Sequence, residues 1–108
     1  MKPDLLLPEI SSVRESASKA CVMLKILANE DRLLILCELS QGPKNVGELE
    51  AILDIHQPTL SQQLTVLREE KLVTTERKGK YIYYHMASTE AIKIMQTLFE
   101  LYCNAKKQ

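Results

Sequence analysis

The sequence predicts a mainly α-helical domain with one β-hairpin, its elements in the order α-α-α-α-β-β-α. Apolar residues recur at helical spacing in four segments before residue 72 and in a fifth after residue 88. Between the fourth and fifth helices lie two short β-prone runs joined by a basic tetrapeptide that contains a glycine. The length of 108 residues fits one domain. We therefore expect a flexible arm over residues 1–10, where two prolines oppose regular structure, and a single domain over residues 11–108.

The first two predicted helices form the N-terminal part of this domain. The first begins at Ser11 or Ser12, since either side chain can cap a helix, and runs to Leu27. The second begins near Asn29, with acidic residues in its first turn, and stops before the Gly-Pro pair at 42–43. Because this second helix is apolar on nearly every side, we expect it to form the buried centre of the fold.

Two shorter helices follow, joined by a tight connection over residues 54–56. The third is predicted from Val46 to Leu53. The fourth begins at Gln57-Pro58, because proline is tolerated in the first turn of a helix, and continues to Lys71. The apolar side chains expected to face the core are Val46, Leu49, Ile52 and Leu53 on the third helix and Leu60, Leu64 and Leu67 on the fourth.

The hairpin and a last helix complete the domain. The predicted strands are Leu72–Glu76 and Tyr81–Met86, joined by the basic tip Arg77–Lys80 with its glycine at the turn. The last helix is amphipathic, is capped by Ser88 or Thr89, and runs to residue 103. Two helices joined by a short turn and followed by a β-hairpin make a winged helix-turn-helix.

Composition excludes several classes of protein. No apolar run approaches the roughly 20 residues needed to cross a bilayer, and the N-terminal apolar stretch is too short for a signal peptide. We therefore expect a cytoplasmic protein with no membrane partner. The sequence offers no Cys/His pair at a recognisable spacing, no phosphate-binding glycine loop and no pair of catalytic carboxylates. We accordingly expect that the chain is not an enzyme.

The charges are distributed unevenly although they sum to zero, with 14 basic and 14 acidic side chains. Residues 1–56 carry six Lys or Arg and nine Asp or Glu, whereas residues 57–86 carry five and three. The basic excess thus falls on the fourth helix and the hairpin. This distribution is compatible with a nucleic-acid partner but does not identify one.

The fourth helix and the hairpin have the residues of a DNA-reading unit. In a helix-turn-helix the second helix enters the major groove, and uncharged Gln, Thr and Ser side chains hydrogen-bond bases and phosphates. The expected contacts with double-stranded DNA are Gln57, Thr59, Ser61, Gln62 and Gln63, with Arg68 on the backbone and Arg77, Lys78 and Lys80 on the backbone or an adjacent minor groove. Taken alone, either set is better explained as a solvated surface. Their combination at this spacing favours DNA binding.

These residues carry a family resemblance. Four segments resemble the ArsR/SmtB family of winged-helix repressors: Leu24–Leu33, Val46–Leu49, Gln57–Leu64 and Leu67–Val73. The chain departs from the family pattern at Gln63, where many members have His, and at Asp54, where many have Gly. The resemblance implies a homodimer, built from the first and last helices, that binds an imperfect inverted repeat and releases it when an inducer binds.

Many members of this family sense metal ions, but the usual ligands are missing here. Residues 46–53 contain no Cys or His, and the last helix has only Glu90 and Glu100 as acidic side chains. The two histidines, His56 and His85, lie in the turn and in the second hairpin strand. Because zinc requires several nitrogen or sulfur ligands, we expect neither a metal nor another cofactor. A metal-responsive repressor remains an alternative.

Three cysteines remain to be explained, and their spacing matches neither a disulfide framework nor a zinc site. Burial alone favours inert packing. However, Cys37 and Cys103 resemble the pattern of a subgroup that includes biofilm growth-associated repressors, sulfide-responsive repressors and HlyU-type regulators. This resemblance implies that the two thiols react with persulfides or oxidants, forming a disulfide or a sulfur-bridged link that weakens DNA binding. Cys21 has no counterpart in the pattern, and we expect it to pack in the dimer interface.

Two further alternatives stay open. The first is an activator of the HlyU type, which displaces a silencing protein from DNA instead of repressing a promoter. The second is a protein–protein adaptor that does not bind DNA. A strong dependence of affinity for a defined duplex on salt concentration excludes the adaptor.

Overall fold

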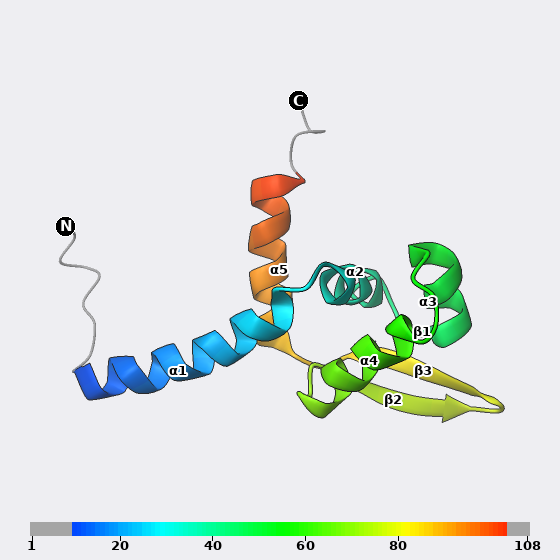
Figure 1. The fold of residues 1–108 in the computed structure, drawn as a ribbon, viewed down its shortest axis with the longest axis horizontal. Helices are drawn as coiled ribbons and strands as arrows, with labels where there is room; N and C mark the ends of the chain where they lie inside the picture. Colours follow the sequence, from blue (N-terminus) through cyan, green and yellow to red (C-terminus); the bar gives the residue numbers. More distant parts are fainter. Residues whose placement is uncertain (1–9, 104–108) are drawn as a thin grey trace.

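The computed structural model describes residues 10–103 and has the architecture of a winged helix-turn-helix (Figure 1). The elements in chain order are α1 (Ile10–Leu27), α2 (Glu30–Leu39), β1 (Lys44–Asn45), α3 (Val46–Leu53), α4 (Thr59–Glu69), β2 (Val73–Lys78), β3 (Tyr81–Met86) and α5 (Thr89–Tyr102). The five predicted helices and the hairpin are confirmed, and one short strand is added. The expected arm over residues 1–10 lies outside the described residues, except for Ile10, which begins α1.

The added strand, β1, joins the hairpin in a three-stranded antiparallel sheet of order β1-β3-β2. Lys44 pairs with Tyr84 and Asn45 with Tyr83. Asn45 also caps α3, since its side chain accepts a hydrogen bond from the Glu48 amide and the Glu48 carboxylate accepts one from the Asn45 amide, both at 2.9 Å. This capping box fixes the start of α3 beside the base of the hairpin.

The hairpin is longer and tighter than the sequence predicted. Lys78 pairs with Tyr81, so only Gly79 and Lys80 form the turn. The predicted four-residue tip is therefore wrong, because Arg77 and Lys78 continue β2. Gly79 has a φ of +64°, which a two-residue hairpin turn requires at its first central position and which glycine adopts without strain.

The helix starts confirm the predicted cap at Ser88, correct the one at Ser11 or Ser12, and add a cap at Asn29. Asn29 caps α2 by accepting a hydrogen bond from the Arg32 amide at 3.0 Å. Ser88 caps α5 in the same way. Ser11 and Ser12 do not cap α1, because the helix already includes Ile10.

The fourth helix is shorter than predicted at both ends. It begins at Thr59 and ends at Glu69, whereas the sequence predicted Gln57 to Lys71. Lys71 has a φ of +67°, a left-handed conformation that turns the chain toward β2 and cannot continue a helix.

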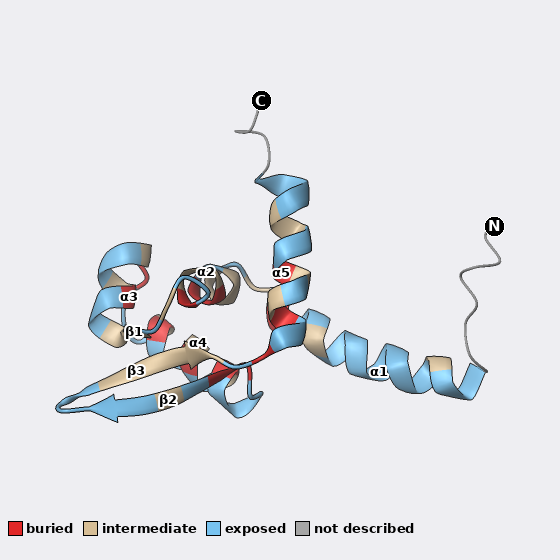
Figure 2. Ribbon diagram, turned by 180° about the vertical axis from the view of Figure 1, so that it is seen from behind, coloured by how far each residue is buried: buried red, intermediate tan, exposed pale blue. Residues whose placement is uncertain are grey.

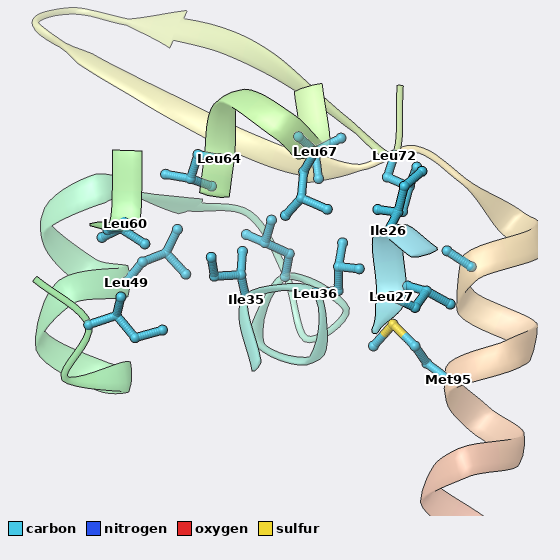
Figure 3. Close-up of a cluster of buried hydrophobic side chains, with 14 residues drawn as sticks. Ile26, Leu27, Ile35, Leu36, Leu49, Leu60, Leu64, Leu67, Leu72 and Met95 are labelled. Carbon is cyan, nitrogen blue, oxygen red and sulfur yellow. The ribbon is translucent and has the colours of Figure 1, made fainter. Parts of the chain in front are cut away.

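The core lies between α2 and α4 (Figure 3). Leu60, Leu64 and Leu67 of α4, at most 1% exposed, lie over Ile35 and Leu36 of α2. Leu49 of α3 closes one end of this layer and Met95 of α5 closes the other. The predicted inward stripe of α4 and the central position of α2 are confirmed.

The predicted inward face of α3 is partly wrong. Leu49 is fully buried and Val46 and Leu53 are half-buried, but Ile52 is 51% exposed. Figures 1 and 2 show α3 at one end of the molecule, and only a narrow side of it is buried. Consequently the side that carries Ile52 faces solvent.

The helices α1 and α5 project from the rest of the domain (Figure 2). The Cα radius of gyration is 16.5 Å, against about 13 Å for a compact domain of this length. Only Ile26 and Leu27 are buried in α1, and only Ala91 and Met95 in α5. No helix within residues 10–103 is long and apolar enough to cross a membrane.

We predict that Leu49→Ala and Ile52→Ala, two truncations in α3, differ strongly in cost. Leu49→Ala removes a fully buried side chain and should lower the free energy of unfolding by about 2–5 kcal/mol. Ile52→Ala removes a half-exposed side chain and should cost less than about 1 kcal/mol. Urea unfolding at a fixed protein concentration measures both; equal costs would contradict the packing of α3.

Candidate nucleic-acid interface and thiol pair

The outer face of α4 carries most of the polar side chains that the sequence predicted as DNA contacts. Gln57, Ser61 and Gln62 are exposed, and Thr59 is half-buried. Gln57 precedes the helix, and its side-chain oxygen accepts hydrogen bonds from the Ser61 amide at 3.1 Å and the Ser61 hydroxyl at 2.6 Å. Pro58, at the cap position, makes no side-chain hydrogen bond of this kind. The amide group of Gln57 is thereby held beside the start of α4.

One predicted contact, Gln63, is placed differently from its neighbours. It is half-buried, and its side-chain oxygen accepts a hydrogen bond from Nη1 of Arg32 in α2 at 2.8 Å. Arg32 was not among the predicted site residues. It is the one cation of α2, but its partner lies 31 residues along the chain.

The wing, formed by β2, β3 and their turn, carries exposed cations and aromatic rings together. Arg77, Lys78 and Lys80 are all exposed, as is Arg68 near the end of α4. The ammonium group of Lys78 lies 5.9 Å from the ring centre of Tyr83, and that of Lys80 lies 5.6 Å from the ring centre of Tyr81. Such contacts hold the cations near the strands. The sequence predicted that these cations contact DNA, but it did not indicate that tyrosine rings lie beside two of them.

The turn between α3 and α4 contains a charge cluster centred on His56. Nε2 of His56 lies 2.8 Å from the Asp54 carboxylate, and Nδ1 lies 3.2 Å from the Glu50 carboxylate. Hydrogen bonds to Glu50 and then to Asp54 raise the pKa of His56 above its ordinary value, since they favour the imidazolium ion. Within residues 10–103, no three His, Cys, Asp or Glu side chains are arranged to hold a metal ion.

The three cysteines occupy different environments, and all are free thiols. Cys37 on α2 is half-buried, whereas Cys103 at the end of α5 and Cys21 on α1 are exposed. Burial raises the pKa of the Cys37 thiol, and the negative charges of Glu38 and Cys103 raise it further. Cys37 packs against the core cluster, as does Phe99 of α5, whose carbonyl accepts the backbone hydrogen bond of Cys103.

We predict a measurable pKa shift for His56. An NMR titration should give a pKa above about 6.5, the ordinary value for histidine. The two contacts stabilise the turn below that pH, and the stabilisation is lost as the pH rises through the raised pKa of His56. The double variant Glu50→Gln with Asp54→Asn should bring the pKa back toward its ordinary value. An unchanged pKa in that variant would show that the carboxylates do not cause the shift.

Comparison with known proteins places this arrangement in a family. Residues 29–75 match the family described as bacterial regulatory protein, arsR family. The chain is 45% identical to the biofilm growth-associated repressor of Agrobacterium fabrum over 94 residues, which is 87% of this chain and 80% of that protein. It is 39% identical to the transcriptional activator HlyU of Vibrio cholerae over 98 residues, 91% of each chain.

A solved structure gives the same result for the fold. The crystal structure of the transcriptional repressor BigR from Xylella fastidiosa superposes with a TM-score of 0.79 at 39% identity, covering 91% of this chain and 97% of that one. These relatives are transcriptional regulators with a DNA-binding fold, so the chain is not an enzyme. On this evidence the chain belongs to the ArsR family of bacterial regulatory proteins.

Proposed function

We propose that this chain is a homodimeric transcriptional repressor of the bacterial cytoplasm whose affinity for an inverted-repeat operator is controlled by Cys37 and Cys103. The observation that carries the DNA-binding part is the exposed polar face of α4 beside a basic wing. The thiol part is supported by the packing of Cys37 and of Phe99, one turn before Cys103, against the same core cluster, and by the similarity to the biofilm growth-associated repressor.

The proposed interface uses α4 for bases and the wing for phosphates. Gln62 is exposed on the outer face of α4, opposite the leucines that hold the helix, and its amide matches the donor and acceptor pattern of adenine. Thr59, Ser61 and the amide group of Gln57 lie at the start of α4, where free backbone N–H groups also favour a phosphate. The cations that contact the DNA backbone are Arg68, Arg77, Lys78 and Lys80.

A second copy of the chain explains the apolar faces of α1 and α5. On α1, Val22 is 52% and Leu24 is 55% exposed, and on α5, Leu101 is 66% and Tyr102 is 78% exposed. Large apolar side chains gathered on projecting helices are typical of a surface that a partner covers. In the dimer these helices pair with their counterparts, and the two α4 helices then reach half-sites about 34 Å apart.

The chemistry of the thiols follows from their exposure. Cys103 is open to solvent, so its thiolate attacks the outer sulfur of a low-molecular-weight persulfide and releases the corresponding thiol. Cys37 then attacks the inner sulfur of the Cys103 persulfide, which forms a disulfide and releases hydrogen sulfide. If both cysteines first become persulfides, their condensation gives a trisulfide and releases one hydrogen sulfide. Peroxide gives the plain disulfide through a sulfenic acid and releases two molecules of water.

A link between Cys37 and Cys103 ties α2 to the end of α5. The helix α2 supports α4 through the core, and α5 lies in the proposed dimer interface. The link therefore changes the distance and angle between the α4 helices of the two protomers. A dimer that cannot match the half-site spacing engages only one half-site, and its affinity falls. This is the proposed mechanism of induction.

A second candidate is an activator that displaces a silencing protein. The similarity to a transcriptional activator from Vibrio cholerae favours it. Both candidates share the interface and the thiol pair. A reporter assay with and without the silencing protein separates them, because a repressor lowers transcription in both strains and an activator raises it only where the silencer is present.

We predict that Gln62→Ala weakens specific binding by about 1–3 kcal/mol, because a base contact is lost. The measurement is fluorescence anisotropy with the operator and with duplexes carrying single base changes. The matched control is Lys78→Gln, which should weaken binding to every duplex equally and reduce the slope of log affinity against log salt by about 1. If Gln62→Ala also weakens all duplexes equally, Gln62 is a phosphate contact.

We predict that Cys37→Ser and Cys103→Ser keep operator affinity in the reduced state but lose the response to glutathione persulfide. Wild type should lose affinity after the same treatment, and Cys21→Ser should behave as wild type. Peptide mass spectrometry should show a link between Cys37 and Cys103, as a disulfide or trisulfide after persulfide and as a disulfide alone after peroxide. A wild type that loses affinity without forming this link would contradict the mechanism.

A further inference from the structure

Arg32 connects three helices through a single guanidinium group. It lies in the first turn of α2 and is half-buried. Its Nε donates to the carbonyl of Ile26 at 2.6 Å and its Nη2 to the carbonyl of Lys25 at 3.2 Å, both in the last turn of α1. Its Nη1 donates to the side-chain oxygen of Gln63 in α4 at 2.8 Å.

The two contacts with α1 satisfy backbone carbonyl groups that have no hydrogen-bond partner within the helix. The last carbonyls of a helix have no partner within the helix and carry its partial negative charge. The guanidinium group offers five donors in a rigid planar fork, so one cation can bind two carbonyls and a third acceptor at fixed angles. Asn29 also holds the backbone of Arg32, as the cap of α2. The contacts with α1 and with Asn29 therefore fix the position of the guanidinium group that binds α4.

The contact with α4 is directional where the rest of the packing is not. Leucines pack without strong angular preference, so the buried stripe of α4 allows small rotations of the helix. A hydrogen bond from a charged donor is short and depends on angle. Gln63 lies between exposed Gln62 and buried Leu64, at the margin where a rotation of α4 would lengthen that bond.

We infer that Arg32 and Gln63 form a positioning pair that sets the orientation of α4 relative to the end of α1, and that Gln63 is not a DNA contact. The inference rests on the proposed DNA-binding function and revises the role expected for Gln63. Because α1 lies in the proposed dimer interface, the pair also connects the position of that interface to the reading helix.

Substitution by glutamate distinguishes positioning from DNA contact. A carboxylate at position 63 still accepts the hydrogen bond from Arg32, and charge strengthens that bond. A carboxylate on a DNA-contacting side chain is repelled by phosphates. Gln63→Glu should therefore keep operator affinity within about threefold of wild type, whereas the matched control Gln62→Glu should lose about tenfold or more. If Gln63→Glu loses as much as Gln62→Glu, the inference is wrong.

Removal of the acceptor tests the pair a second way. Gln63→Leu should weaken operator binding about fivefold, because α4 loses its directional contact. Gln63→Glu, which keeps an acceptor for Arg32, should retain the operator affinity that Gln63→Leu loses. In the Arg32→Lys background, which keeps the charge but not the fork, Gln63→Leu should have no further effect. An equal loss in both backgrounds would show that Gln63 acts independently of Arg32.

A measurement without DNA separates this inference from the proposed function. The Arg32 guanidinium N–H signals in the NMR spectrum should shift in Gln63→Leu and stay unchanged in Gln62→Leu. If wild type binds no duplex but this pattern appears, the proposed function fails and the pair stands. If wild type binds its operator and both variants leave the Arg32 signals unchanged, the pair fails and the proposed function stands.

Discussion

Leu60, Leu64 and Leu67 bury the inner side of α4 against Ile35 and Leu36 of α2, and this contact decides which side chains α4 leaves in solvent. Each fully buried leucine contributes about 1.5–3 kcal/mol, so a large rotation of α4 exposes more apolar surface than this small domain tolerates. The polar face is consequently held outward, beside the wing. Without this packing the same glutamine, serine and threonine side chains have no common direction.

The helix that supports α4 also carries the two residues that we propose control it, Cys37 and Arg32. Cys37 lies on α2 and packs against the core cluster, and the guanidinium group of Arg32, also on α2, contacts both α1 and α4. In the proposed mechanism, a covalent change at Cys37 acts directly on the helix against which α4 packs, with no need for a long chain of contacts. Burial raises the pKa of the Cys37 thiol, whereas Cys103 is exposed, so the proposed reaction begins at Cys103. This division of roles gives the proposed switch an order of events.

Periodicity predicted the helices from their apolar stripes, and it failed where burial depends on position in the fold. The strand β1 has only two residues and exists because β3 lies beside it, so no local pattern marks it. Ile52 has the spacing of a core residue but lies on the solvent side of a helix at the end of the molecule. Side-chain contacts were harder still, because no local pattern pairs Gln63 with Arg32, which lies 31 residues away in the sequence. The carboxylates around His56 come from a turn whose geometry only the fold defines.

The claim that the domain reads DNA as a symmetric pair is tested most directly by selecting bound fragments from the genomic DNA of the source organism with the reduced protein and sequencing them. The account predicts enrichment of one inverted repeat whose half-sites are centred about 10 base pairs apart, or a multiple of that, on the same side of the duplex. Enrichment of isolated half-sites with no fixed spacing, or no enrichment above a non-specific background, would contradict it.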